Sequence, residues 1–336
     1  MKVIQFLWII LAFVVLSSCR NNQGSGIGTV SSDEELASLN AQIAKNDKDA
    51  SLYLKRAGIF FNRQLLNDAL ADLNKVLELE PKSTPGYLLL SKVYILMGKP
   101  QQALESLNVA CNLDPGSMEA FLEKAKLYLV MKDYENCAVA VDKVLELDNR
   151  NADAYFIRGV ALDENGEAAK AVEAFRLAVT SDPGHYDALM QLGYAFSESN
   201  PSMAIDYFSN AVKADTSSIE ALYNLGMLLQ ENEKQDRALE IYDKILRIEP
   251  TNKLALYNSG YVNLVYEKEF SKAADFFSRA ITIDSAYTDA YYNRGYAYEL
   301  NGDIQKARKD YERVLQLRVN DPKAVGGLNR LDRAAR

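Results

Sequence analysis

Few residues of this chain could do chemistry on their own. The single histidine, His185, argues against histidine-based catalysis and histidine-rich metal sites. The three cysteines, Cys19, Cys111 and Cys137, lie too far apart for a disulfide framework or for the paired spacing of zinc ligands. The segment GSGIG at 24–28 follows no strand pattern, so it is not a dinucleotide-binding loop. We therefore expect no catalytic residue, no cofactor and no metal site.

Cys19 follows a segment that is typical of exported proteins. Lys2 supplies a positive charge, and residues 3–16 form an almost unbroken apolar run. This run is shorter than the roughly 20 residues that span a bilayer, and it fits the hydrophobic region of a signal peptide. The sequence LSSC at 16–19, which ends the run, resembles the lipobox of bacterial lipoproteins.

The resemblance implies that residues 1–18 are a signal peptide and that Cys19 is acylated after cleavage. Residues 19–32 would then be the acylated cysteine and a flexible tether, and several acyl chains would hold the protein stably at a bilayer. The Asp that retains such lipoproteins at the inner membrane is replaced by Arg20, which favours the outer membrane, facing the periplasm. An uncleaved anchor helix, or a signal peptide with a chance cysteine, is the alternative.

The overall composition is that of an ordinary folded protein. Of the 336 residues, 48% are hydrophobic and 25% are charged, which excludes wholesale disorder and fibrous chains. Acidic residues outnumber basic ones by 46 to 38, giving a net charge of −8. Because nucleic-acid binding requires a basic surface, this balance gives no reason to expect it.

One pattern recurs eight times between residues 50 and 321. Each copy has a bulky fourth residue, a small eighth residue, Ala or Cys at position 20, and a turn at its end. This pattern resembles the tetratricopeptide repeat, a helical hairpin with a period of about 34 residues. The repeats implied are 50–83, 84–117, 118–151, 152–185, 186–218, 219–252, 253–287 and 288–321. The eighth position holds Ala57, Ser91, Ala125, Gly159, Gly193, Gly226, Gly260 and Gly295.

The repeats predict an all-α fold, a right-handed α-α superhelix (solenoid). Small residues at positions 8 and 20 let the two helices of a repeat approach closely, and stacked neighbours bury a continuous core. Capping helices are expected at 33–49 and 322–336. Cys137 and Cys111 fall on small and apolar positions, so we expect buried thiols, with a disulfide between them as the alternative. His185 is expected in a solvent-exposed turn.

The family resemblance implies that the first helix of each repeat lines a concave groove, with positions 2, 5 and 9 facing a partner. Positions 5 and 9 are mainly Leu, Lys or Gly in the first three repeats and mostly aromatic in the last five. The predicted partner-binding residues are Phe156, Met190, Tyr194, Tyr223, Met227, Tyr257, Tyr261, Tyr292, Tyr296, Asp153, Asp187 and Glu220. An aromatic floor with an acidic wall would suit a protein or peptide with apolar and basic residues. Alternatively, these residues serve only stacking and solubility.

Two further family features bear on the groove. The carboxylate clamp of chaperone-binding members needs Lys at position 5 and Asn at position 9, which no repeat has, and this argues against capture of an acidic C-terminus. Asn224, Asn258 and Asn293, at position 6, could hydrogen-bond either a peptide backbone or a neighbouring helix.

The leading functional hypothesis is a non-enzymatic, lipid-anchored interaction scaffold of the cell envelope that holds a partner peptide or helix in its groove. The alternative is a structural assembly subunit, or pilotin-like factor, of an outer-membrane complex. That second function predicts a large apolar patch on the convex face instead of in the groove.

Overall fold

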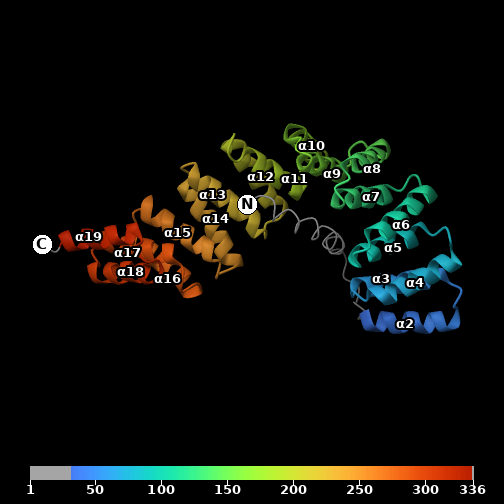
Figure 1. Ribbon diagram of the computed structural model, residues 1–336, viewed down its shortest axis with the longest axis horizontal. Coiled ribbons are helices and arrows are strands. Elements are labelled where there is room, and N and C mark those ends of the chain that lie inside the picture. Colours follow the sequence, from blue (N-terminus) through green and yellow to red (C-terminus); the bar gives the residue numbers. More distant parts are fainter. Residues whose placement is uncertain (1–31, 335–336) are drawn as a thin grey trace. The chain divides into compact units, whose positions relative to one another are not determined.

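The computed structural model describes residues 32–334, which fold into helices joined by short turns and contain no strand (Figure 1). The predicted all-α class is therefore confirmed for this part of the chain. The predicted signal peptide, Cys19 and the tether up to residue 31 lie outside the described residues. Between residues 32 and 334, none of the helices has both the length and the apolar character needed to cross a membrane.

The helices form two compact bodies that divide after Ser181. The first body contains α2 (Ser32–Lys45), α3 (Ala50–Asn62), α4 (Leu66–Leu79), α5 (Thr84–Leu96), α6 (Pro100–Leu113), α7 (Met118–Val130), α8 (Tyr134–Leu147), α9 (Ala152–Glu164) and α10 (Ala168–Ser181). The second contains α11 (Tyr186–Phe196), α12 (Pro201–Ala214), α13 (Ile219–Glu231), α14 (Gln235–Ile248), α15 (Lys253–Val265), α16 (Phe270–Ile283), α17 (Thr288–Leu300), α18 (Ile304–Leu317) and α19 (Pro322–Ala334).

Each predicted repeat contains two of these helices, which pack against each other as a hairpin, and hairpins that adjoin within a body stack on one another. Side chains cap most of the first helices. Ser117 accepts a hydrogen bond from the backbone N–H of Ala120 at 3.3 Å, and Asn151 accepts one from Ala154 at 2.9 Å. Such caps satisfy backbone donors that a helix terminus leaves without partners.

The expectation for His185 is wrong, because this residue is also a helix cap and is buried. Its Nδ1 accepts a hydrogen bond from the backbone N–H of Ala188 at 3.2 Å, at the start of α11. Asn151 and Ser218 occupy the same capping position in neighbouring repeats, so His185 takes over their role at the start of α11.

Small residues at position 8 allow close helix contact. A Cβ atom built on Gly193 would lie 2.5 Å from the ring of Phe208, and one on Gly159 would lie 2.5 Å from the ring of Phe175. Both distances are too short for real atoms, so the aromatic ring occupies the space that a side chain on the first helix would need. This contact sets how closely the first helices approach the second ones.

An arginine at position 7 ties helices together in both bodies. Arg294 of α17 donates two hydrogen bonds to Asp310 of α18, at 2.8 and 2.7 Å, and a third to Ser278 of α16 at 3.0 Å. In the first body Arg56 of α3 makes the same paired contact with Asp72 of α4, with both distances 2.7 Å. One guanidinium thus joins the two helices of a hairpin.

Candidate functional site

The predicted partner-binding residues of the second body lie on its first helices, the odd-numbered ones. α15 contacts α17 as well as α16, and α17 contacts α19, so these helices are neighbours across successive hairpins. We call the surface that they carry the tyrosine face. It comprises Tyr194, Tyr223, Met227, Tyr257, Tyr261, Tyr292 and Tyr296.

Two predicted contact residues have little surface to offer a partner. Phe156 on α9, in the first body, is only 7% exposed, and its ring packs 5.8 Å from that of Phe175. Met190 on α11 is 4% exposed. Phe156 thus packs on the second helix of its own hairpin, and because both side chains are buried we leave them out of the candidate site.

Tyr194 is held between two helices by hydrogen bonds. Its hydroxyl donates to the Glu220 carboxylate at 2.7 Å and accepts from Asn224 Nδ2 at 2.9 Å. Its ring packs edge-on against Phe208, with ring centroids 5.4 Å apart. Burial, together with the hydrogen bond to Glu220, raises the pKa of Tyr194 above its ordinary value. Tyr194 and Glu220 therefore form a neutral donor and a charged acceptor that fix α11 to α13.

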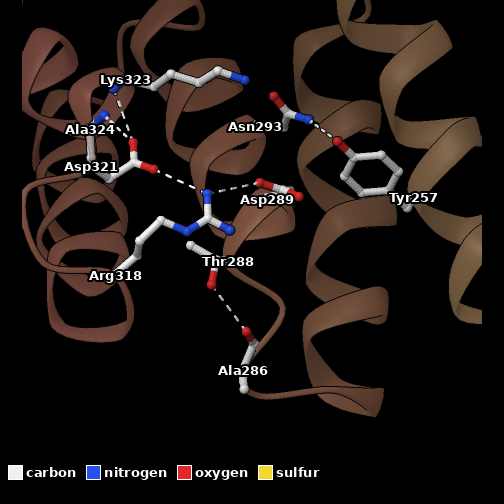
Figure 2. Close-up of polar contacts among 9 residues, drawn as sticks. All are labelled: Tyr257, Ala286, Thr288, Asp289, Asn293, Arg318, Asp321, Lys323 and Ala324. Carbon is white, nitrogen blue, oxygen red and sulfur yellow. Dashed lines mark hydrogen bonds and ion pairs between the residues drawn. The ribbon is translucent and has the colours of Figure 1, made fainter.

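The position-6 asparagines bind neighbouring helices, which decides between the two roles that the sequence left open. Asn293 of α17 donates from Nδ2 to the Tyr257 hydroxyl of α15 at 2.8 Å (Figure 2). Asn258 of α15 lies 3.1 Å from the Met227 sulfur of α13. Together with Asn224, these amides join successive first helices, so at least one N–H of each is already engaged.

Tyr257 is a packing residue more than a surface residue. Its ring lies 5.6 Å from that of Phe277 and 5.0 Å from that of Tyr287, measured between centroids. Burial raises the pKa of Tyr257 to about 12. The ring therefore supports the face from beneath.

Tyr194 is 40% exposed but its hydroxyl is engaged, whereas Tyr223 and Tyr261 are the tyrosines of this face with the fewest polar contacts. Both rings are partly exposed. The Tyr261 ring makes one aromatic contact, with Tyr266 at 6.4 Å. Among residues 32–334, neither hydroxyl makes a hydrogen bond and no cation lies over either ring. These two rings offer rigid, amphipathic contact area on α13 and α15.

Basic side chains of α19 cover the last two tyrosines. The ammonium of Lys323 lies 5.6 Å from the Tyr292 ring centroid, and the Arg330 guanidinium carbon lies 5.5 Å from that of Tyr296. The two rings are nearly parallel, at 11° with centroids 6.4 Å apart. Tyrosine rings of this face therefore accept cations, as the ring quadrupole predicts.

The acidic residues are divided between internal contacts and the surface. Figure 2 shows Arg318 between two carboxylates, with Asp321 at 3.2 Å and Asp289 at 3.7 Å. Glu220 and Asp153 are exposed, and Asp187 is partly exposed. Asp153 belongs to the first body, so the acids predicted to form one wall are spread over both bodies.

The two cysteines within the described residues are buried. Cys111 and Cys137 are free thiols and are buried, so the disulfide alternative is not realised. Burial raises the pKa of Cys137 to about 12, which keeps its sulfur protonated and unreactive. Within residues 32–334 no group of His, Cys, Asp and Glu side chains is arranged to hold a metal ion. The absence of catalysis stays a prediction.

Family models place the fold among known proteins. Three models described as tetratricopeptide repeat match residues 288–321, residues 122–186, and residues 84–117 and 219–252. The solved C-terminal part of a TPR repeat-containing protein from Cytophaga hutchinsonii aligns over 71% of this chain and 98% of its own, with a TM-score of 0.57 and 19% identity. This likeness supports the fold alone.

The curated relatives are larger proteins. Protein FlbA of Caulobacter vibrioides is 26% identical over 175 residues, which is 52% of this chain and 29% of that protein. The human mitochondrial import receptor subunit TOM70 is 26% identical over 180 residues, covering 51% of this chain and 30% of that protein. The matched region thus spans less than a third of either relative.

Proposed function

The chain belongs to the tetratricopeptide repeat family, and from this premise we propose that it is a non-enzymatic scaffold that binds a partner protein on its tyrosine face. The observation that carries the proposal is the exposure of Tyr223 and Tyr261 and, among residues 32–334, the lack of hydrogen bonds to their hydroxyls. Both rings are partly exposed and, within the described residues, neither hydroxyl is used to hold the fold together. Tyrosine in such a setting is enriched at binding hot spots because it loses little side-chain entropy on binding.

Charge and neighbouring contacts favour a partner with apolar and basic residues. Glu220 is exposed on α13, beside Tyr223 in the helix turn, and the chain as a whole is acidic. Acidic surface speeds the encounter with a basic partner. Lys323 and Arg330, seated on Tyr292 and Tyr296, supply an example within the same body of cations on these rings. The name of the relative TOM70, an import receptor subunit, is compatible with binding of protein segments.

The scaffold would be anchored to a membrane through Cys19. The support is the sequence LSSC at 16–19 after an apolar run, which resembles a lipobox, and Arg20 favours the outer membrane of a bacterial envelope. Replacement of Cys19 by Ala should abolish incorporation of a labelled fatty acid and move the protein out of the detergent-soluble membrane fraction. If the Cys19→Ala variant still incorporates the label, the anchor lies elsewhere.

The binding proposal is tested by crosslinking from the face. A photo-crosslinking amino acid at position 223 or 261 of the full chain should capture a discrete partner from the membrane fraction. The same group at Tyr207 is the matched control and should capture no partner, because Tyr207 lies on α12, a second helix, where its ring stacks on Phe196. Tyr223→Ala with Tyr261→Ala should weaken the capture of that partner by the full chain, whereas Tyr207→Ala should leave it unchanged. Equal capture from all three positions would reject the tyrosine face.

A further inference from the structure

The carboxylate of Glu299, at the end of the tyrosine face, lies in a setting that matches a guanidinium group. The Glu299 side chain, near the end of α17, is only 15% exposed. Arg330 of α19 donates from Nε to one carboxylate oxygen at 2.7 Å and from Nη2 to the other at 2.8 Å. A guanidinium can form this pair of parallel hydrogen bonds and an ammonium cannot.

Two tyrosines complete the surroundings of this carboxylate. The buried Tyr311 hydroxyl donates to Glu299 at 2.5 Å and accepts a longer hydrogen bond from Arg330 at 3.4 Å. The Tyr296 ring lies 5.5 Å from the guanidinium carbon. Burial alone would raise the pKa of Glu299, but the hydrogen bonds from Arg330 and Tyr311 outweigh it and lower the pKa. The site therefore offers a charged, oriented acceptor together with an aromatic face.

The helix that carries Arg330 has a low intrinsic helix propensity. α19 has two consecutive glycines in its interior, and glycine is a poor helix former. Gly327 is needed, because a Cβ atom there would lie 2.5 Å from the Tyr311 ring. Gly326 is not, because a Cβ atom there would meet only a nitrogen of Arg330, at 3.9 Å. Arg330 itself keeps 45% of its side chain exposed.

We propose that Glu299, Tyr296 and Tyr311 form a guanidinium-binding site, which Arg330 fills within the chain and which an arginine of the partner fills in its place. This inference deepens the proposed function, on which the partner's role rests, by naming a group that the partner presents. Arg330 is held at this site by α19, which packs on α17 and α18, so it competes as an intramolecular ligand. A partner arginine therefore needs support from further contacts, such as those at Tyr223 and Tyr261.

The site can be tested without the partner. The probe is N-acetyl-arginine methylamide, added to the full chain in detergent, with N-acetyl-lysine methylamide as the probe of equal charge. Arg330→Ala should bind the arginine probe at least about tenfold more tightly than the unaltered chain does, since the tethered competitor is gone. The arginine probe should also raise the Tm of this variant, and the lysine probe should have a much smaller effect because it cannot bind in bidentate fashion.

Four further variants serve as controls. Glu299→Gln combined with Arg330→Ala should abolish binding of the arginine probe. Arg308→Ala removes an ion pair between α18 and Asp332 of α19, and it should bind the probe as weakly as the unaltered chain. Arg330→Lys keeps the charge and the aliphatic stem in case Arg330→Ala loosens α19, and it should still bind the probe more tightly than the unaltered chain. Gly326→Ala, which strengthens α19, should weaken probe binding further.

The proposal is overturned if the unaltered chain and both Arg330 variants bind the arginine probe equally, if binding survives loss of the Glu299 charge, or if the lysine probe binds as tightly. Any of these results would leave the proposed function standing, because crosslinking from Tyr223 and Tyr261 does not depend on Arg330. Conversely, failure of that crosslinking with successful probe binding would reject the scaffold proposal, and the partner arginine with it, but not the guanidinium-binding site.

Discussion

The contact between positions 8 and 24 of a repeat is built in two ways along this chain. In the first three repeats the pairs are Ala57 with Leu73, Ser91 with Leu107, and Ala125 with Val141, all buried. In the last five they are Gly159 with Phe175, Gly193 with Phe208, Gly226 with Tyr242, Gly260 with Phe277, and Gly295 with Tyr311. As one side chain grows the other shrinks, so the total volume between the two helices is conserved.

The change brings polar chemistry into the later repeats. When position 24 is Tyr, its hydroxyl needs a buried partner, and position 12 of the same repeat supplies one. Tyr242 donates to Gln230 at 3.0 Å, and Tyr311 donates to Glu299 at 2.5 Å. The first-helix face changes in parallel, because ion pairs such as Lys92 with Glu119 in the first body give way to tyrosines in the second. One fold thus carries a charged face and an aromatic face.

The largest expected difference between the bodies is in alkaline stability. Burial, as the main cause, raises the pKa of several second-body tyrosines, namely Tyr186, Tyr194, Tyr242, Tyr257, Tyr287, Tyr292 and Tyr311. In the first body the same holds for Tyr128 and Tyr134. A tyrosine with a raised pKa in the folded state stabilises fully below its unfolded pKa of about 10, and this stability is lost as the pH rises toward the folded value.

The second body should therefore unfold first as the pH rises from 10 to 12, the range set by Tyr186 and Tyr257, whose pKa is about 12 in each case. Allowing for partial exposure, the loss is on the order of 3 kcal/mol. Hydrogen exchange followed by mass spectrometry at increasing pH resolves the two bodies. Simultaneous loss of protection in residues 32–181 and 182–334 would contradict the comparison.

The ion pairs Arg56–Asp72 and Arg294–Asp310 stabilise the two bodies in the same way, which substitution of each arginine tests. Arg56→Ala should destabilise the first body and Arg294→Ala the second, each by about 2–4 kcal/mol, because the partner Asp is left buried without its cation. Urea unfolding measures the free energy of unfolding for each variant. Arg247→Ala removes an exposed pair with Asp243 and should change nothing measurable. Unequal losses from Arg56 and Arg294 would show that the bridge depends on its surroundings.

The volume exchange predicts a smaller effect, with a rescue. Gly193→Ala should lower the free energy of unfolding by about 1–3 kcal/mol, since its Cβ would overlap the Phe208 ring. Phe208→Leu in the same chain recreates the pairing of the first repeats and should recover part of that loss. A double-mutant cycle in urea isolates the coupling. Additive losses would mean that the two positions do not trade volume.

Much of this organisation is readable from the sequence, because the spacing of small and bulky residues dictates hairpins wherever a hydrophobic core must form. Exposure at position 5 is less predictable. Met190 and Phe156 are buried, whereas Tyr223 is partly exposed at the same position. Side-chain length and the neighbouring helix decide how far each side chain reaches. The contacts of Glu299 were missed for a related reason. α19 is only half a repeat, so the packing of α19 on α17 and α18 determines where Arg330 lies.

The sixth and seventh repeats differ at position 11, which is apolar in one and polar in the other. Asn263 is 1% exposed there, and its Oδ1 has no hydrogen-bond partner among the described residues, although its Nδ2 donates to the Ser259 carbonyl at 2.7 Å. The preceding repeat has the buried Leu229. Asn263→Leu should raise the free energy of unfolding by about 1–2 kcal/mol, because it removes a buried acceptor without a partner. Leu229→Asn should do the reverse. If Asn263→Leu is destabilising in urea unfolding, the buried amide supports its helix in a way that an apolar side chain cannot replace.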